Sequence, residues 1–409
     1  MKLKVAILLF VLCTVIGVAH AQQKVKAPTP PMGFMTWNYF ADKITEQDVK
    51  TLADAMVESG LRDLGFNFIF IDDGWQGGRD HKNNMIPDPK KFPSGMKALT
   101  DYVHSKDMKI GIYSDAAPLT CAGYTASLYF EEQDAKTFAN WGFDYLKYDY
   151  CGAPADWQTA IARYSKMSEA LNKSGRDISF GICEWGDRAP WLWAKKAGGQ
   201  LWRTTADVRD KWFSGQKNAT PHELHGYGAG ILDIVNINAK LHAYAGPGGW
   251  NDPDMLVVGL YGKKGPSGDL GGTGCTDVEY QSQMSLWCLM AAPLMITCDV
   301  RNMNEATKRI LTNKDIIAID QDPLGIQAER KIFNDTWQVF VKPLANGDIA
   351  LGVLNTSDKT QTININLPEL GIANKTVATD VWSKSNIKIK NTMKLSVAAH
   401  ETKVYRISK

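Results

Sequence analysis

The sequence predicts an α/β protein, a (β/α)8 TIM barrel followed by a C-terminal antiparallel β-sandwich. Short strand-like runs alternate with amphipathic helical patterns from residue 32 onward, and eight such runs precede residue 325. Beyond that point the helical periodicity disappears and short strand-like runs follow one another closely. Alternation of strands and helices favours a parallel sheet, and eight repeats favour a closed barrel. A chain of 409 residues is long enough for two domains.

Each predicted barrel strand is a short, largely apolar run, and most of the runs lead into a polar or acidic residue. Thr45 and Asp48 form a capping pair that predicts the start of the first helix. An open doubly wound sheet is the alternative, but that fold usually carries a Gly-rich nucleotide loop after its first strand. The first strand here has no such loop. The eight predicted strands are 32–37, 66–71, 109–113, 143–151, 178–182, 201–205, 250–256 and 292–298.

The C-terminal part has the pattern of a small all-β domain of ~80 residues. Turn residues such as Asn346 and Gly347 separate some of its strand-like runs. We therefore expect a catalytic barrel over residues 22–325 and a β-sandwich over residues 326–409. The predicted strands of the second domain are 337–341, 349–354, 362–367, 377–382, 387–389, 394–397 and 402–407.

The N-terminus has the pattern of an export signal. Lys2 and Lys4 precede an apolar run over residues 5–18, and Ala19-His20-Ala21 has the small-x-small form of a cleavage site. We expect residues 1–21 to be a signal peptide and the mature protein to be secreted or periplasmic. The run is short for a transmembrane span, and no later stretch is long and apolar enough to be one.

Composition narrows the range of ligands. The formal net charge is +2 with both signs mixed along the chain, which gives no indication of nucleic acid or of an anionic membrane as a partner. No CxxC or Cys/His cluster has the spacing of a zinc site. The chain contains thirteen Trp residues. Several adjoin Asp or Gly, as in sites that stack on sugars, although a Trp is equally suited to a core.

Carboxylates follow many of the predicted strands. Lys147 and Asp149 lie two residues apart at the end of the run over 143–151, so both point to one face. The alternative to a functional role is an exposed strand-end Asp that pairs with a surface Lys. In a barrel, however, strand ends meet around one mouth, and a ring of acids there suits a neutral polyhydroxylated ligand better than a phosphate. The other strand-end acids are Asp72, Asp73, Asp115, Asp207, Asp252 and Asp254.

Seven motifs together resemble those of glycoside hydrolase family 27, the retaining α-galactosidases and α-N-acetylgalactosaminidases. The resemblance covers residues 28–325 in register, and the trailing β-domain also fits the family. The motifs are Pro30-Pro31-Met32-Gly33, Ile71-Asp72-Asp73-Gly74-Trp75, Lys147-Tyr148-Asp149-Tyr150-Cys151, Cys183-Glu184-Trp185-Gly186-Asp187, Trp202-Arg203-Thr204-Thr205-Ala206-Asp207, Gly248-Gly249-Trp250-Asn251-Asp252-Pro253-Asp254-Met255 and Ile319-Asp320-Gln321-Asp322-Pro323-Leu324-Gly325.

The resemblance implies a role for each matching residue. Asp149 matches the nucleophile and Asp207 the acid/base, which in a retaining enzyme stand roughly 5–5.5 Å apart. Asp72 and Asp73 match the pair that binds O4 and O6 of galactose. Trp37 matches a stacking Trp. The further sugar contacts implied by the resemblance are Lys147, Cys183, Trp185, Arg203 and Asp254, with Cys183 and Trp185 beside the C2 position.

Spacing alone leaves the pairing of the cysteines open. The family resemblance implies a disulfide between Cys121 and Cys151, and the other cysteines of the mature chain are expected to be buried thiols. Many family members have a second disulfide near the first two strand ends. Asp42 and Gly74 occupy the two matching positions here.

We therefore expect an exported retaining α-galactosidase that acts on α-galactoside oligosaccharides or glycoconjugates and needs no metal or other cofactor. Lys147 is expected to keep Asp149 ionised, and nearby carboxylates to raise the pKa of Asp207 against the opposing effect of Arg203. Within the family, the alternatives are an α-N-acetylgalactosaminidase and a β-L-arabinopyranosidase. A non-catalytic sugar-binding barrel and a metal-dependent hydrolase are the rivals of a different class.

Overall fold

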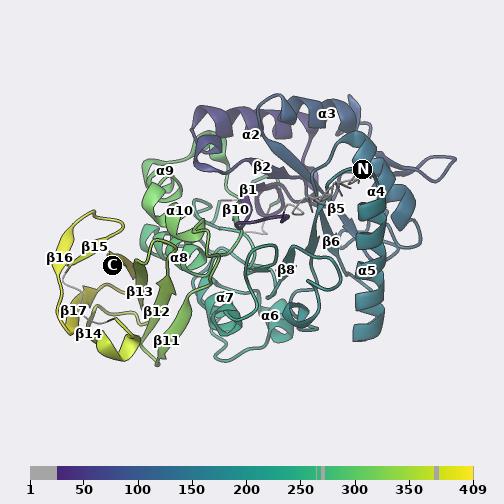
Figure 1. Ribbon diagram of the computed structural model, residues 1–409. Coiled ribbons are helices and arrows are strands. Elements are labelled where there is room, and N and C mark those ends of the chain that lie inside the picture. The colour runs from purple at the N-terminus through teal and green to yellow at the C-terminus, as the bar shows by residue number, and fades with distance from the viewer. Residues whose placement is uncertain (1–24, 264, 269–271, 373–376, 409) are drawn as a thin grey trace, which may run out of the picture.

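Eight parallel strands form the central sheet of the computed structural model, which describes residues 25–263, 265–268, 272–372 and 377–408 (Figure 1). The expected signal peptide lies outside these residues. Each predicted barrel strand overlaps an observed strand, so the predicted α/β barrel is confirmed. The barrel strands are β1 (Met32–Met35), β2 (Phe68–Phe70), β5 (Lys109–Asp115), β6 (Tyr145–Asp149), β7 (Ser179–Ile182), β8 (Leu201–Arg203), β9 (Trp250–Asp252) and β10 (Leu294–Ile296).

The strands follow one another around the sheet in the order β10-β1-β2-β5-β6-β7-β8-β9, and every pairing is parallel. The ring closes beyond β9, where Leu256 forms a parallel bridge with Ile296 and its N–H donates to the Met295 carbonyl at 2.8 Å. The carboxyl ends of all eight strands therefore point to one mouth, as a closed barrel requires.

Helices follow most of the barrel strands, as the alternation of strand and helix patterns predicts. Thr45 and Asp48 form the predicted capping box at the start of α2. No helix among the described residues is both long and apolar enough to span a membrane. The α-helices are α1 (Trp37–Phe40), α2 (Glu46–Glu58), α3 (Gly95–His104), α4 (Glu131–Trp141), α5 (Trp157–Lys173), α6 (Pro221–Tyr227), α7 (Ile231–Asn238), α8 (Asp277–Leu289), α9 (Glu305–Leu311) and α10 (Lys314–Asp320).

Two local predictions for the barrel were wrong. The first predicted strand, 32–37, ends at Met35, and Trp37 already begins α1. The link between β7 and β8 contains only the 3-10 helix η3 (Pro190–Leu192) instead of an α-helix. Glycine and proline residues interrupt this link, and both residue types disfavour helix interiors. The link is left as an irregular segment at the mouth of the barrel.

The lower part of the barrel is filled by aromatic side chains. Tyr145 on β6 packs edge-to-face on Phe70, with ring centroids 4.6 Å apart. Gly181 on the neighbouring strand β7 leaves room for the Tyr145 phenol, because a Cβ at residue 181 would lie only 1.7 Å from the phenol oxygen. The floor beneath the mouth is therefore a packed core and not a channel.

A β-hairpin that the sequence pattern did not predict follows β2. Its strands, β3 (Gln76–Arg79) and β4 (Met85–Pro87), pair in antiparallel fashion. The connecting turn is organised by Asp80, whose carboxylate accepts hydrogen bonds from the N–H groups of Lys82 and Asn84, each at 2.8 Å. Strands of three and four residues are too short for a clear alternating pattern.

The C-terminal part is the predicted antiparallel sandwich. One sheet has the order β11-β12-β13-β18-β15-β16, and β14 pairs with β17 in a second, two-stranded sheet. All seven predicted runs contain strands, whereas β11 was missed because its residues are largely charged or exposed. The strands are β11 (Glu329–Phe333), β12 (Trp337–Pro343), β13 (Ile349–Asn355), β14 (Gln361–Asn366), β15 (Val377–Asp380), β16 (Asn386–Lys388), β17 (Thr392–Val397) and β18 (Thr402–Ile407).

Helix α8 of the barrel packs against the C-terminal sheet (Figure 1). Buried residues of the β-domain, including Phe340 and Val404, belong to the same apolar cluster as the barrel core. Hydrogen bonds cross the same contact: the Trp382 indole donates to the Ser285 hydroxyl at 3.0 Å, and the Lys342 ammonium donates to the Cys288 carbonyl at 3.2 Å. The β-domain thus supports the barrel along α8.

Candidate active site

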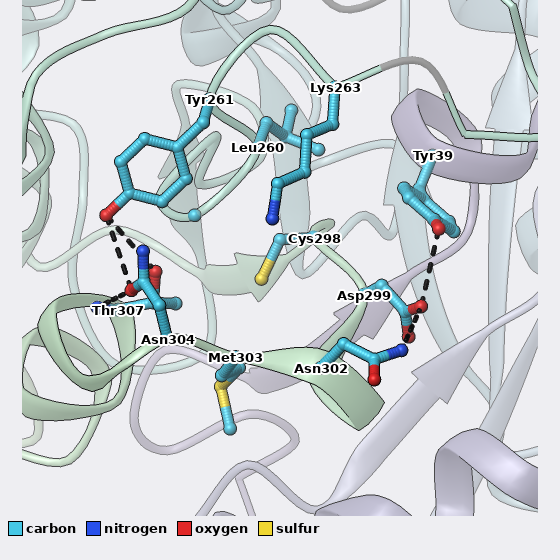
Figure 2. Close-up of a pocket in the computed structure, with 11 residues that line it drawn as sticks. Tyr39, Leu260, Tyr261, Lys263, Cys298, Asp299, Asn302, Met303, Asn304 and Thr307 are labelled. Carbon is cyan, nitrogen blue, oxygen red and sulfur yellow. Dashed lines mark hydrogen bonds between the residues drawn. The ribbon is translucent and has the colours of Figure 1, made fainter.

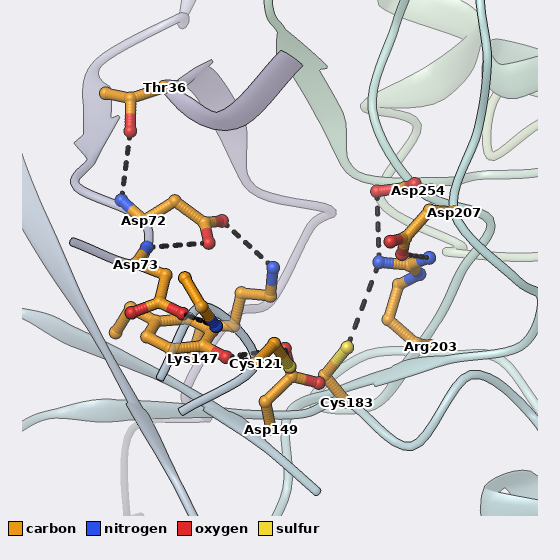
Figure 3. Close-up of polar contacts among 12 residues, drawn as sticks. Thr36, Asp72, Asp73, Cys121, Lys147, Asp149, Cys183, Arg203, Asp207 and Asp254 are labelled. Atoms are coloured by element: carbon orange, nitrogen blue, oxygen red, sulfur yellow. Dashed lines mark hydrogen bonds and ion pairs between the residues drawn. The ribbon is translucent and has the colours of Figure 1, made fainter. Parts of the chain in front are cut away.

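One half of the mouth is organised around two neighbouring acids after β2. Asp72 and Asp73 are both buried. The Lys147 ammonium from β6 donates to Asp72 Oδ2 at 2.9 Å, and the N–H of Ala122 donates to Asp73 Oδ2 at 2.8 Å (Figure 3). Burial raises the pKa of Asp73 to about 6, against the opposing effect of the Ala122 N–H. The predicted pair is therefore assembled and held by hydrogen bonds.

The other half is organised around Arg203 at the end of β8. Its guanidinium is only 3% exposed and pairs with Asp207 Oδ1 at 2.9 Å and Asp254 Oδ1 at 3.1 Å. The Cys183 sulfur, 3.8 Å from the guanidinium, lies between this half and Lys147 (Figure 3). One buried guanidinium thus orients two carboxylates that come from different strand ends.

Asp149 lies at the carboxyl end of β6, as predicted, and is buried. The Tyr113 phenol of β5 donates to Asp149 Oδ2 at 2.9 Å. Burial raises the pKa of Asp149 above its ordinary value, and the charge of Lys147 acts in the opposite direction. The charge of Lys147 thus favours the ionised form, as predicted, although burial has the larger effect on this pKa. Lys147 makes its direct ion pair with Asp72 and reaches Asp149 only through its field.

Asp207 lies four residues beyond Arg203, and its side chain is 44% exposed. Burial raises its pKa, but the charges of Arg203 and Lys147 together with the hydrogen bond from Arg203 hold the pKa of Asp207 below its ordinary value. The expected rise of this pKa is therefore wrong for the free protein, because the opposing effect of Arg203, joined by the charge of Lys147, prevails. The group is anionic and open to the mouth before a ligand enters.

Asp115 is a further buried acid beside Asp149, and it is the residue that pairs with Asp149 in the β5–β6 register. The N–H of Cys151 donates to Asp115 Oδ2 at 3.0 Å. The disulfide between Cys121 and Cys151 is present as predicted, and its Cys121 sulfur lies 3.5 Å from Asp149 Oδ2. Burial and the charge of Asp149 raise the pKa of Asp115 to about 9. A neutral Asp115 leaves Asp149 as the charged member of the pair.

Replacement of Asp115 with asparagine is expected to leave kcat/KM within about tenfold of wild type, because the native group is already uncharged near neutral pH. Its effect on stability should depend on pH. The folded protein keeps this proton up to about pH 9, whereas the unfolded chain releases it near pH 3.8. The wild-type free energy of unfolding should therefore fall more steeply than that of D115N as pH rises through this window. Parallel Tm-against-pH curves for the two proteins would contradict the assignment.

The remaining predicted sugar contacts are Trp37, Trp185 and Cys183. Trp37 begins α1, and Trp185 follows Cys183 in the loop after β7; both indoles are half-buried and pack against the barrel core. Trp185 has a left-handed backbone, with φ +57°, and its indole meets the His225 ring edge-to-face at 5.5 Å. Whether Trp37 and Trp185 contact the sugar stays a prediction. Cys183 is a buried free thiol, as are Cys275, Cys288 and Cys298.

The rim that lacks the second family disulfide is held in another way. Asp42 and Gly74 are neighbours, since a Cβ on Gly74 would lie 2.6 Å from that of Asp42. The Lys91 ammonium donates to the carbonyl oxygens of both residues, at 2.6 and 2.7 Å, and the Tyr124 phenol donates to the Asp42 carboxylate at 2.8 Å. Hydrogen bonds therefore connect the two positions that a disulfide joins elsewhere in the family.

A separate hollow lies between the segments that follow β1, β9 and β10 (Figure 2). Its wall includes Tyr39, Lys263 and Cys298, and the Tyr39 phenol donates to Asp299 at 3.3 Å. The cavity has a volume of about 100 Å³. This is room for a few waters but less than the roughly 300 Å³ of a typical ligand pocket.

Sequence reasoning missed several residues that complete the mouth. Tyr113 was not proposed, although it lies two residues before Asp115 on β5 and therefore points to the same face. Tyr145 and Met255, which were not proposed either, line the floor together with Lys147 and the strand-end acid Asp252. The alternation of side chains along β5 and β6 was the available signal for the two tyrosines. The irregular backbone around Met255 offered no such signal.

Both parts of the chain match known protein families. A family model described as "Alpha galactosidase A" matches residues 29–322, and one described as "Alpha galactosidase C-terminal beta sandwich domain" matches residues 334–407. An α-galactosidase from Oryza sativa subsp. japonica is 41% identical over 381 residues, which cover 92% of this chain and 84% of the rice protein.

Solved structures are also similar to this chain in fold and sequence. A candidate α-galactosidase/melibiase from Bacteroides fragilis has a TM-score of 0.87 and 47% identity, covering 93% of this chain and 79% of that one. The α-galactosidase of Saccharomyces cerevisiae, solved with raffinose, has a TM-score of 0.84 and 30% identity, covering 93% and 98% of the two chains.

A (β/α)8 barrel with buried acids at its strand ends and a trailing β-sandwich, together with these matches, identifies this protein as a retaining glycoside hydrolase. Identities of this level, over nearly the whole chain, narrow the class further. The chain belongs to the α-galactosidase A family, glycoside hydrolase family 27, and its enzyme class is that of the α-galactosidases, which act on α-galactosides.

Proposed function

We propose that the enzyme releases terminal α-linked galactose by double displacement, with Asp149 as nucleophile and Asp207 as acid/base. The contrast between these two carboxyls carries the proposal. Asp149 is buried at the end of β6 with one oxygen fixed by the Tyr113 phenol. Asp207 is 44% exposed on the opposite half of the mouth. A nucleophile must be held rigidly against the sugar, whereas an acid/base must meet both the leaving group and water.

In the first step Asp207 protonates the glycosidic oxygen as the bond between that oxygen and C1 breaks. An oxygen of Asp149 attacks C1 from the opposite face, forming a galactosyl ester with inverted configuration. The Tyr113 phenol, 2.9 Å from Asp149 Oδ2, fixes the orientation of the attacking carboxylate. No metal or other cofactor has a place in this step.

In the second step Asp207, now ionised, removes a proton from a water molecule, and that water attacks C1. The ester bond to Asp149 breaks, α-galactose leaves, and Asp207 holds the proton for the next cycle. Two inversions at C1 preserve the α configuration. The ion pair between Arg203 and Asp207 assists this step, because it favours the ionised form of Asp207 that accepts the proton from water.

Substrate binding must raise the pKa of Asp207 for the first step to begin. A neutral sugar that covers the exposed part of this side chain removes water from it, and desolvation favours the protonated form. The ionised Asp149 nearby acts in the same direction, and its charge disappears once the ester forms. The pKa of Asp207 is thus expected to rise when substrate binds and to fall when the intermediate forms.

The galactose is proposed to lie with its O4 and O6 hydroxyls on Asp72 and Asp73. Each carboxylate still has acceptor capacity beyond its hydrogen bonds within the protein. Lys147, between Asp72 and the Cys183 thiol in Figure 3, supplies donors on the same side of the mouth. Trp37 is proposed to stack on the apolar face of the ring. Raffinose, bound in the yeast relative, is a sugar that ends in an α-linked galactose.

α-Galactosides are expected to be better substrates than α-N-acetylgalactosaminides and β-L-arabinopyranosides. Trp185 is proposed to limit the space at C2, which excludes the acetamido group. The arabinopyranoside lacks the hydroxymethyl group and leaves a buried acceptor of the Asp72–Asp73 pair unmatched. Such a loss costs about 1–3 kcal/mol, or roughly ten- to a hundredfold in kcat/KM. The p-nitrophenyl glycosides of the three sugars provide the comparison.

A matched pair of variants separates the wall at C2 from a general effect. W185A should narrow the difference between the galactoside and its N-acetyl analogue, whereas W157A, which alters an exposed indole on α5, should leave that difference unchanged. Equal turnover of both sugars by the wild-type enzyme would show that Trp185 leaves the space at C2 open.

The enzyme is further proposed to be exported, because the N-terminal residues have the pattern of a cleaved signal peptide. Protein recovered from outside the cytoplasm should begin near Gln22. N-terminal sequencing of that protein tests this proposal, and a retained Met1 would contradict it.

A further inference from the structure

Asp187, His222 and His225 form a cluster of metal-ligating side chains outside the proposed sugar site. Asp187 lies in the loop after β7, two residues beyond Trp185, and both histidines belong to α6. Histidines three residues apart on a helix lie on one face. One ligand atom from each of the three residues can be chosen so that all lie within 4.8 Å of one another. The fold thus brings a carboxylate from one loop to two imidazoles from another.

The spacing within the cluster differs from that of simple ion pairs. His222 Nδ1 lies 3.4 Å from Asp187 Oδ2, and His225 Nε2 lies 3.5 Å from Asp187 Oδ1. Charge-assisted hydrogen bonds are normally about 2.7–2.9 Å long. Neighbouring ligand atoms of a tetrahedral zinc ion with bonds of about 2.0–2.1 Å lie about 3.3 Å apart. Each imidazole nitrogen lies near this separation from a different oxygen of the Asp187 carboxylate.

The state of the carboxylate also suits a ligand. Asp187 Oδ1 is shielded from solvent, and no described donor completes a hydrogen bond to it. His222 is 82% exposed, which leaves the solvent side open for a water as fourth ligand.

We propose that Asp187, His222 and His225 form a binding site for a divalent transition metal of the zinc class at the rim of the active-site mouth. Two imidazoles and a carboxylate are a common three-ligand set for this ion. No step of galactoside hydrolysis uses this metal. The ion would connect α6, which carries both histidines, to the loop that contains Asp187 and Trp185. The His225 ring already meets the Trp185 indole edge-to-face at 5.5 Å, so the site adjoins that indole.

The direct test measures zinc binding by the untagged full-length enzyme after removal of metals with a chelator. Isothermal titration with zinc chloride should show one saturable site. The variants H222A, H225A and D187N each lack one proposed ligand and should bind zinc at least tenfold more weakly than wild type. Loss of a residue that only supports a ligand already weakens metal binding by about this factor. H81A is the matched control, because His81 is an exposed histidine on the β3–β4 turn and does not belong to the cluster. The H81A variant should bind zinc with the affinity of the wild-type enzyme.

Substitution with cobalt provides a readout that is independent of enzyme activity. Cobalt in a four-coordinate site with nitrogen and oxygen ligands should give strong visible absorption, which H222A should lose and zinc should displace. The metal-free enzyme should still hydrolyse p-nitrophenyl α-galactoside. Absence of saturable zinc binding by the wild-type enzyme would overturn the proposal. Affinity unchanged in both H222A and H225A would also overturn it, because the ion would then be held by other residues.

Discussion

Replacement of Asp149 with alanine is expected to lower kcat/KM for p-nitrophenyl α-galactoside at least about a thousandfold, which corresponds to a barrier about 4 kcal/mol higher. Without this carboxylate no galactosyl ester can form, and the acid/base alone gives little help to a direct attack by water. The fold should survive, because the substitution removes a raised-pKa carboxyl from a buried position. Initial rates and circular dichroism of the purified variant measure the two effects.

The product of azide rescue tests the role of Asp149 more sharply than the loss of rate. Azide in the cavity left by D149A should attack C1 directly and give β-galactosyl azide, because a single displacement inverts the configuration. The control is D115N, which alters the neighbouring acid in the β5–β6 register and should retain activity without azide. Activity of D149A near that of wild type would refute the assignment.

Replacement of Asp207 with alanine is expected to affect substrates in proportion to their need for acid. Loss of a general acid costs about 10²–10⁴ in rate, so raffinose, with a poor leaving group, should be hydrolysed extremely slowly. A p-nitrophenyl leaving group needs little protonation, so D207A should still form the galactosyl ester with it. Water then attacks slowly without its base. The ester should accumulate, and kcat and KM should both fall.

Azide should rescue D207A with the opposite stereochemistry to D149A. It needs no base, it attacks the accumulated ester, and the product after two displacements should be α-galactosyl azide. Mass spectrometry of D207A quenched during turnover should locate the ester on Asp149. Equal losses on raffinose and on the activated aryl galactoside would show that Asp207 is not the acid.

The exposure of Asp207 also predicts a difference between the two pH profiles of the wild-type enzyme. The free enzyme, in which Arg203 holds the pKa of Asp207 low, determines kcat/KM, whereas the substrate complex determines kcat. The group that must be protonated should therefore titrate at higher pH in kcat than in kcat/KM.

Much of the fold could be predicted because it rests on local patterns. The run over residues 143–151 is apolar and aromatic enough to require a buried strand, and Thr45 with Asp48 signals a helix start in any context. The hairpin of β3 and β4 and the edge strand β11 were missed, since short or charged strands have no clear period.

The candidate site divides in the same way. Asp149 and Asp207 could be singled out because eight parallel strands bring their ends to one mouth, and the family motifs named them. The hydrogen bond from the Tyr113 phenol to Asp149 could have been inferred from side-chain alternation along the strands. The ion pairs of Arg203 with Asp207 and Asp254 could not, because they connect the ends of two different strands. Pairings between distant segments have no signal in spacing.

By itself, then, the sequence determined the barrel, its trailing sandwich, and the acids that surround one mouth, because side-chain alternation and hydrophobic periodicity are local properties of the chain. Only the tertiary structure decided how those acids are charged. Lys147 pairs with Asp72 and not with Asp149, Arg203 lowers the pKa of Asp207, and burial beside Asp149 keeps Asp115 neutral. A pKa depends on burial and on the distance to the nearest charge, and both are set by segments that are far apart in the sequence.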